Sequence, residues 1–293
     1  VLCAMVEKIT GQKMLAYLKD KLLRQIGFSE ESYIIEDPFG TSMAGSGLMA
    51  TPRDLLLTGC MLLKHRTDPY ITRATNAQTS TLLDGENRWY GYQFWIPMEG
   101  MFAMMGLGSQ LMIAVPAMKL VVVITADTQG MGGADQLILT AVREKLLLDT
   151  FTEETLDRKE LPVLKPVYVG IHDDVSGRKY ALRLNHYGFG WCSVTFDEEE
   201  KTGILSYELK GKVCQLPFGI GHLEEGSFPI YKESCVASAA WMDPHTLYIL
   251  CWLTGESVAS IRFRISFAKN ELTVHMMKTE ETKYNEYTGF LNS

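Results

Sequence analysis

The sequence has little of what marks metal-binding, nucleic-acid-binding or membrane-spanning proteins. No pair of its six cysteines has metal-ligand spacing, and none of its six histidines falls in an HExxH or His-x-His pattern. No apolar run approaches the length of a membrane span. The net charge is −7 and no basic stripe occurs. We therefore expect no metal site, no cofactor, no membrane span in this chain and no nucleic-acid partner.

The cysteines are scattered widely and stand mostly in apolar surroundings. Buried, reduced thiols are the default for such cysteines, and structural disulfides are the less favoured alternative. Unpaired thiols favour a cytoplasmic setting. The compartment stays unknown from the sequence, because no N-terminal signal is visible. The six positions are Cys3, Cys60, Cys192, Cys214, Cys235 and Cys251.

The chain is long enough for two domains. It has 293 residues, of which 46% are hydrophobic, so each half can bury a core. A polar stretch at Thr152–Glu160 precedes Leu161-Pro162 and Lys165-Pro166, and charge followed by prolines is typical of a linker. We predict a first domain over residues 1–150, a linker over 151–165 and a second domain over 166–293.

The second domain has a period of two in its apolar residues, which predicts strands separated by short turns. Closely spaced strands without helices indicate an all-β meander or barrel. No convergent set of polar groups is visible, so an interior filled by side chains is favoured over a ligand cavity, and Trp191, Trp241 and Trp252 are expected in the core. The predicted strands are Tyr180–Leu184, Trp191–Phe196, Gly203–Leu209, Thr246–Leu253, Val258–Phe267 and Glu271–Met277.

The first domain combines strands and helices. Trp89–Ile96 and Phe102–Val115 predict two strands, and the continuous apolar run Leu120–Ala126 predicts a third that is buried on both faces. Gly132–Leu148 predicts a helix. The glycines within Gly106–Gln110 favour a hairpin that needs them for its twist, and the alternative is a close approach of backbone to a ligand.

Three ordered segments resemble the serine β-lactamase and penicillin-binding-protein superfamily, in its esterase and 6-aminohexanoate-dimer-hydrolase branch. They are Val1–Phe28, Gly45–Cys60 and Trp89–Asp127. Leu216–Gly219 and Tyr284–Phe290 resemble the lipocalin-like domain attached to many bacterial serine hydrolases of this group. The resemblance implies an α+β chain: the C-terminal part of a β-lactamase/transpeptidase-like fold, an antiparallel sheet with flanking helices, followed by an all-β barrel-like domain.

The motifs that carry catalysis in that family are missing here. The family needs a Ser-x-x-Lys and a Tyr-x-Asn, and no Tyr-x-Asn occurs in this sequence. Ser176 to Lys179 and Lys201-Thr202-Gly203 match motif spellings, but their acidic and glycine-rich flanks predict turns. We therefore expect the nucleophile upstream of this chain and no catalytic residue within it. The chain alone is expected to be inactive and to self-associate through a face left exposed by truncation.

The resemblance also assigns residues to a substrate site. The family's third motif falls on Met104, Met105 and Gly106, with the backbone N–H of Leu107 as an oxyanion donor. Neither methionine supplies charge, which favours a small-molecule ester or amide substrate over a β-lactam. Asp54 is expected to cap a helix, and Trp95 is as well explained by the core as by the site. The expected lining residues are Gly108, Ser109, Gln110, Tyr92, Trp89, Gly45 and Ser46.

Two other functions stay open. One is a binding or regulatory protein on the same scaffold that has lost its catalytic motifs. The other is a small-ligand-binding β-barrel, with the first domain as its support. The main interpretation is acyl-enzyme hydrolysis of an ester or small amide by a longer parent protein.

Overall fold

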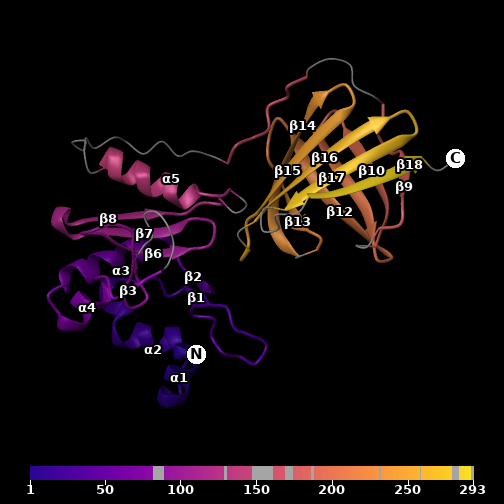
Figure 1. Ribbon diagram of the computed structural model, residues 1–293. Coiled ribbons are helices and arrows are strands. Elements are labelled where there is room, and N and C mark those ends of the chain that lie inside the picture. Colours follow the sequence, from indigo (N-terminus) through magenta and orange to yellow (C-terminus); the bar gives the residue numbers. More distant parts are fainter. Residues whose placement is uncertain are drawn as a thin grey trace. The chain divides into compact units, whose positions relative to one another are not determined.

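The computed structural model describes residues 1–81, 89–128, 131–146, 161–168, 174–185, 188–230, 232–257, 259–278 and 284–291. The chain divides into two compact units, Val1–Thr152 and Glu153–Ser293, which are described separately (Figure 1). Within the described residues, none of the helices is both long and apolar enough to cross a membrane.

The first unit is built on a six-stranded antiparallel sheet with the order β3-β4-β5-β6-β7-β8. Alternate residues of its central strands face opposite helices, as the pleat requires. Met112 and Ala114 pack with Leu62 of one helix, whereas Leu111 and Ile113 pack with Leu139 of another. The strands are β3 (Thr79–Ser80), β4 (Trp89–Tyr90), β5 (Trp95–Ile96), β6 (Phe102–Gly106), β7 (Gln110–Val115) and β8 (Leu120–Ile124).

Helices and short strands complete this unit. The helix α3 begins with a capping box: the side chain of Thr51 accepts from the backbone N–H of Asp54, and Asp54 accepts from that of Thr51. Asp54 is therefore a helix cap, as predicted. The remaining elements are α1 (Leu2–Thr10), α2 (Met14–Lys21), η1 (Leu23–Ile26), β1 (Tyr33–Ile34), β2 (Leu48–Met49), α3 (Pro52–Lys64), α4 (Pro69–Ala74), η2 (Pro116–Met118), α5 (Ala134–Ala141) and the π-helical turn η3 (Val142–Leu146).

The structure changes several predicted elements of the first unit. Trp89–Ile96 is not one strand, because Gly91–Phe94 turns with Gln93 at a φ of 66° and separates β4 from β5. Phe102–Val115 is a hairpin, the form that its glycines favour locally. The prediction that Leu120–Ala126 is buried on both faces is wrong: β8 is an edge strand, and all five of its residues are half-buried.

The second unit is a ten-stranded sheet with the order β12-β11-β10-β9-β18-β17-β16-β15-β14-β13. A parallel contact between β12 and β14 brings its two sides together and makes a nearly closed barrel (Figure 1). The predicted all-β, barrel-like domain is confirmed. The strands are β9 (Lys179–Leu182), β10 (Phe189–Asp197), β11 (Thr202–Leu209), β12 (Lys212–Ile220), β13 (Glu224–Phe228), β14 (Glu233–Asp243), β15 (Thr246–Leu253), β16 (Ser260–Ala268), β17 (Glu271–Lys278) and β18 (Tyr284–Leu291).

Strand alternation decides which side chains fill the barrel. Trp241 is buried in the interior, as predicted, and its ring lies 5.9 Å from that of Phe196 and 6.0 Å from that of Phe267. Trp191 and Trp252 were expected in the core, but both are half-buried and alternate with the inward Cys192 and Cys251. The ammonium of Lys179 lies 3.8 Å from the centre of the Trp191 ring, a cation–π contact on the outer surface.

Consecutive antiparallel strands give the barrel two distinct ends. The Lys269 end carries the β14–β15 turn at 244–245 and the β16–β17 turn at 269–270. The Gly211 end carries the β11–β12 turn at 210–211. Outside the wall, residues 161–168 run along β14: the backbone N–H of Leu164 donates to Ser238 Oγ at 3.1 Å, and that of Tyr168 to the Trp241 carbonyl at 3.1 Å.

Candidate functional site

A small apolar cavity lies inside the barrel, towards its Gly211 end. Its volume is about 30 Å³, which is close to the volume of one water molecule. Half-buried side chains of Leu182, Phe189 and Met276 form part of its wall, and fully buried ones form the rest. The complete lining is Leu182, Phe189, Cys192, Leu205, Tyr207, Phe263, Val274 and Met276.

Tyr207 lines this cavity with its ring and carries a buried hydroxyl behind the apolar surface. Only 5% of Tyr207 is exposed, and its hydroxyl has no hydrogen-bond partner among the described residues. Burial raises the pKa of the phenol well above its ordinary range, so the group stays a neutral O–H donor. An unsatisfied buried hydroxyl costs about 1–3 kcal/mol. A ligand acceptor can reach this donor only when the barrel interior opens.

Thiols surround this tyrosine. Tyr207 is paired across the sheet with Cys192 on β10 and with Cys214 on β12. Burial raises the pKa of Cys192 to about 12, and contact with Cys235 raises the pKa of Cys251. Cys192 and Cys251 are therefore protonated at neutral pH, which makes them weak nucleophiles and weak metal ligands. Among the described residues, no group of three or more His, Cys, Asp or Glu side chains is placed to hold a metal ion.

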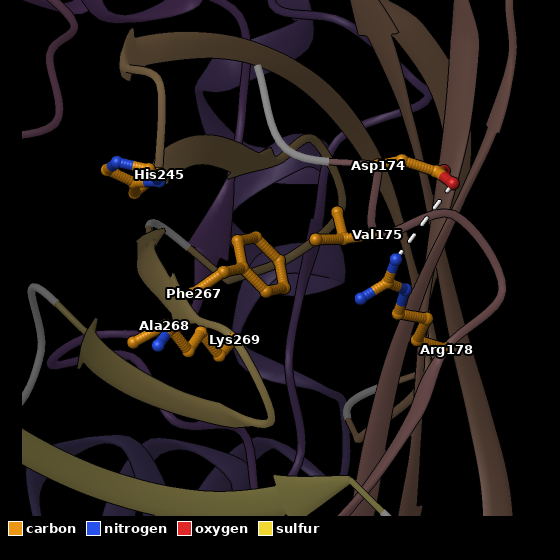
Figure 2. Close-up of a pocket in the computed structure, with 7 residues that line it drawn as sticks. All are labelled: Asp174, Val175, Arg178, His245, Phe267, Ala268 and Lys269. Carbon is orange, nitrogen blue, oxygen red and sulfur yellow. Dashed lines mark ion pairs between the residues drawn. The ribbon is translucent and has the colours of Figure 1, made fainter.

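A larger pocket opens at the Lys269 end of the barrel (Figure 2). Its volume is about 320 Å³. Figure 2 shows the ring of Phe267 at its centre, with Arg178 and Asp174 on one side and His245 on the other. It shares no lining residue with the interior cavity. The lining is Asp174, Val175, Arg178, His245, Phe267, Ala268 and Lys269.

The residues predicted for the third motif lie at the tip of the β6–β7 hairpin. Met104 and Met105 are half-buried in β6, and Gly106 pairs with Gln110 at its end. Leu107 is 77% exposed in the turn, and Gly108 follows it with a φ of 74°. The role of the Leu107 N–H as an oxyanion donor was implied only by the family resemblance.

Ser109 and its neighbours form a buried polar contact that has a structural explanation. Ser109 is 1% exposed, and its hydroxyl lies 2.5 Å from Thr128 Oγ1 and 2.5 Å from Asp135 Oδ1. The side-chain amide of Gln110 donates to the carbonyl of Ala126. These bonds tie the hairpin tip to the chain that enters α5.

The other residues predicted to line the substrate site lie on other elements of the first unit. Trp89 is 47% exposed on β4, and the centre of the Tyr92 ring lies 5.9 Å from that of Tyr70, with the two rings tilted. Gly45 and Ser46 form a turn before β2, where the backbone N–H of Ser46 donates to Met43. None of these residues, and none at the hairpin tip, lines either pocket described above.

Sequence reasoning missed both barrel sites. Tyr207 falls within the predicted strand Gly203–Leu209, where alternation with Leu205 and Leu209 marks it as inward-facing. That pattern was a usable signal. Arg178 lies in a predicted turn and Lys269 lies between two predicted strands, but nothing in the sequence shows that both border one pocket.

Comparison with known proteins identifies no family for this chain. No family model matches the chain, and no curated protein matches it. Among solved structures, a fatty acid-binding protein from Drosophila melanogaster brain is 12% identical, covers 40% of this chain and 99% of its own length, and has a TM-score of 0.33. Lipid binding protein 8 of Caenorhabditis elegans is 10% identical over 41% of this chain and 100% of its own, with a TM-score of 0.34.

A third match, the Schistosoma mansoni fatty acid binding protein in complex with arachidonic acid, is 10% identical. It covers 42% of this chain and all of its own, with a TM-score of 0.34. At these identities and scores the matches carry no statement about what this chain binds.

The predicted membership of the β-lactamase and penicillin-binding-protein superfamily is wrong. No family model supports it, and the structural matches are fatty-acid-binding, lipocalin-like barrels with no β-lactamase-like protein among them. The prediction of serine hydrolase activity of the esterase or amidase type depended on that membership and is wrong as well. For the segment Trp89–Asp127, the physical reason is that its glycines and aromatic residues are ones that hairpins require for their own geometry.

Proposed function

We propose that the second unit is a binding module for a small, mainly apolar ligand with one hydrogen-bond acceptor, held inside the barrel beside Tyr207. The observation that carries this is the unpartnered hydroxyl of Tyr207, which is buried behind a cavity whose exposed lining is entirely apolar. A water molecule would fit the volume, but a stable buried water needs two to four polar partners. An apolar molecule with an acceptor satisfies the hydroxyl and keeps the lining dry.

The acceptor that fits is a neutral carbonyl or hydroxyl oxygen. The phenol donates one hydrogen bond, and the cavity has no cation in its lining to balance a carboxylate. An ester or amide carbonyl meets this requirement, so a small ester or amide is a candidate ligand of the barrel and not its substrate.

Binding requires the barrel interior to open, because about 30 Å³ holds only one small group. The half-buried Leu182, Phe189 and Met276 are the lining side chains that can move with least loss of packing. Methionine in particular changes shape at low cost. The aromatic cluster of Trp241 and Phe267 fills the opposite half, so the apolar chain of a ligand extends towards the Gly211 end.

Displacement of a neutral fluorescent probe tests the proposal. The full chain is titrated with N-phenyl-1-naphthylamine, and bound probe is displaced with decan-2-one, which carries an acceptor, or with decane, which does not. The variant Val274→Phe fills the cavity and is expected to abolish probe binding. The matched control Val213→Phe places the same ring on a side chain that is 63% exposed, and should bind normally.

Overpacking costs roughly 1–3 kcal/mol, so thermal unfolding is used to show that Val274→Phe is folded. Absence of probe binding to the native chain would contradict the proposal. So would normal binding by folded Val274→Phe.

A further inference from the structure

The pocket at the Lys269 end has the size and the mixed lining of a small-molecule site. Its volume of about 320 Å³ stands at the lower limit of the roughly 300–1,000 Å³ usual for ligand pockets. Phe267 and Val175 form an apolar floor and are 5% and 3% exposed. Charged side chains from two separate turns stand around it, Arg178 before β9 and Lys269 after β16 (Figure 2).

The floor of this pocket is held in place by the barrel. The backbone N–H of Phe267 donates to the carbonyl of His245 at 2.8 Å, which fixes the β14–β15 turn against β16. The backbone N–H of Gly177 donates to Val194 at 2.8 Å and fixes the turn that carries Arg178. The Phe267 ring packs 6.0 Å from the rings of both Tyr180 and Trp241. A site fixed in this way loses little conformational entropy when a ligand binds.

The charges around the pocket favour an anion. Arg178 and Lys269 are the formal cations of the lining, and Asp174 is its one carboxylate. The closest atoms of Arg178 and Asp174 are 4.0 Å apart, and 91% of the Asp174 side chain is exposed, so this ion pair holds the guanidinium only weakly. Lys269 forms no ion pair with any other residue of the described part of the chain.

The neighbouring pocket is a useful contrast. It has a volume of about 270 Å³ and lies on the other side of the same turn, because Asp174 and Val175 line both pockets. Its lining adds Asp197 and Glu198 against the single cation Lys201. An anion is therefore repelled from that pocket and attracted to the one beside Lys269.

We propose that the pocket at the Lys269 end binds a small carboxylate with a flat apolar body. The apolar body lies on Phe267 and Val175, and the carboxylate faces Lys269 and Arg178, which exchanges its weak pairing with Asp174 for the ligand. This site is separate from the interior cavity in both position and ligand charge. It does not depend on the function proposed for that cavity.

Calorimetric titration of the full chain with benzoate, and with the neutral isostere benzamide, tests this site. Benzoate is expected to bind and benzamide to bind much more weakly. Lys269→Met and Arg178→Met are each expected to weaken benzoate binding about threefold or more, the effect of losing one partly exposed ion pair. Asp174→Asn is expected to strengthen it, because it removes the carboxylate that competes for Arg178.

The matched control is Lys210→Met. Lys210 also lies in a hairpin turn with a positive φ, 49° against 48° for Lys269, but at the Gly211 end of the barrel. It removes one positive charge without touching the pocket, and benzoate binding should be unchanged. Equal loss in Lys210→Met and Lys269→Met would overturn the proposal, as would equal affinity for benzoate and benzamide or no benzoate binding up to about 10 mM. A gain in Asp174→Asn supports it without requiring any variant to lose stability.

Discussion

Replacing Tyr207 by phenylalanine is expected to stabilise the free protein and weaken its ligand complex. The substitution removes one oxygen from the interior and leaves the ring, which alternates inward with Leu205 and Leu209, in place. In the free protein that oxygen is buried without a partner among the described residues. This unpartnered oxygen therefore lowers the stability of the free protein, because no hydrogen bond compensates for its burial.

The size of the stability change follows from the cost of an unsatisfied buried hydroxyl, about 1–3 kcal/mol. Part of this is offset by the void that the oxygen leaves, so an increase of about 1 kcal/mol in the free energy of unfolding is expected. For a domain of this size that corresponds to a rise of roughly 3 °C in the melting temperature. Thermal unfolding of the ligand-free chain, followed by circular dichroism, measures it.

The size of the affinity change follows from one lost hydrogen bond. A neutral hydrogen bond contributes about 0.5–1.5 kcal/mol, so Tyr207→Phe should weaken decan-2-one binding roughly two- to tenfold. Decane binding should not change, because decane has no acceptor. The control is Tyr248→Phe, which removes a hydroxyl from the half-buried outer position between Leu247 and Ile249 and should leave both affinities unaltered.

Two results would refute this reasoning. A Tyr207→Phe chain that is less stable by about 1 kcal/mol would show that the hydroxyl has a partner in the free protein. An unchanged affinity for decan-2-one would show that the ligand does not reach Tyr207.

Other positions give independent tests. Burial raises the pKa of Asp54, but hydrogen bonds from the backbone N–H groups of Ser29 and Thr51 outweigh it, so the net pKa lies below the ordinary value. The Asp54 carboxylate therefore adds stability above the pKa of the unfolded chain, and this stability is lost as the pH falls through the pKa of the folded protein. The stability advantage over Asp54→Asn, measured by urea unfolding, should therefore shrink from about pH 6 to about pH 3. Gly91→Ala should unfold the first unit or lower its melting temperature sharply, since its Cβ would lie 2.0 Å from a carbonyl oxygen, whereas Gly45→Ala meets nothing within 4 Å and should melt normally. Iodoacetamide should modify the exposed Cys60 well before Cys192, with mass spectrometry of peptides as the readout, because burial keeps the Cys192 thiol protonated.

The strands that the sequence predicts are those with a strong period of two. In β15 the inward Leu247, Ile249 and Leu253 alternate with less buried residues, and the predicted bounds match the observed ones. The strand β14 was missed because its inward positions include the small Ala237 and Ala239, while the outward Ser238 is 0% exposed beneath the segment that carries Leu164. A strand covered on both faces by tertiary contacts loses the alternation that identifies it.

The failed resemblance has a local explanation. The turn between β6 and β7 places Gly108 and Ser109 at φ values of 74° and 65°, and the turn between β4 and β5 brings Gly91 against a neighbouring backbone. Glycine and small polar residues are favoured at such positive φ values and close backbone contacts in any sheet with short connections. A match between these residues and the strands of another family therefore reflects shared hairpin geometry and not shared catalytic chemistry.

The distribution of side chains inside the barrel decides where a ligand can enter. At the Lys269 end, the rings of Phe196, Trp241 and Phe267 pack as tilted pairs and hold the floor of the outer pocket in place. At the Gly211 end, the lining mixes one thiol and three aromatic rings with aliphatic chains such as Met276, and the hydroxyl of Tyr207 behind it lacks a partner among the described residues. Rings packed against rings move only together, whereas a methionine changes rotamer alone. This distribution supports our two proposals, an apolar ligand in the half that contains Met276 and a small anion in the surface pocket at the Lys269 end.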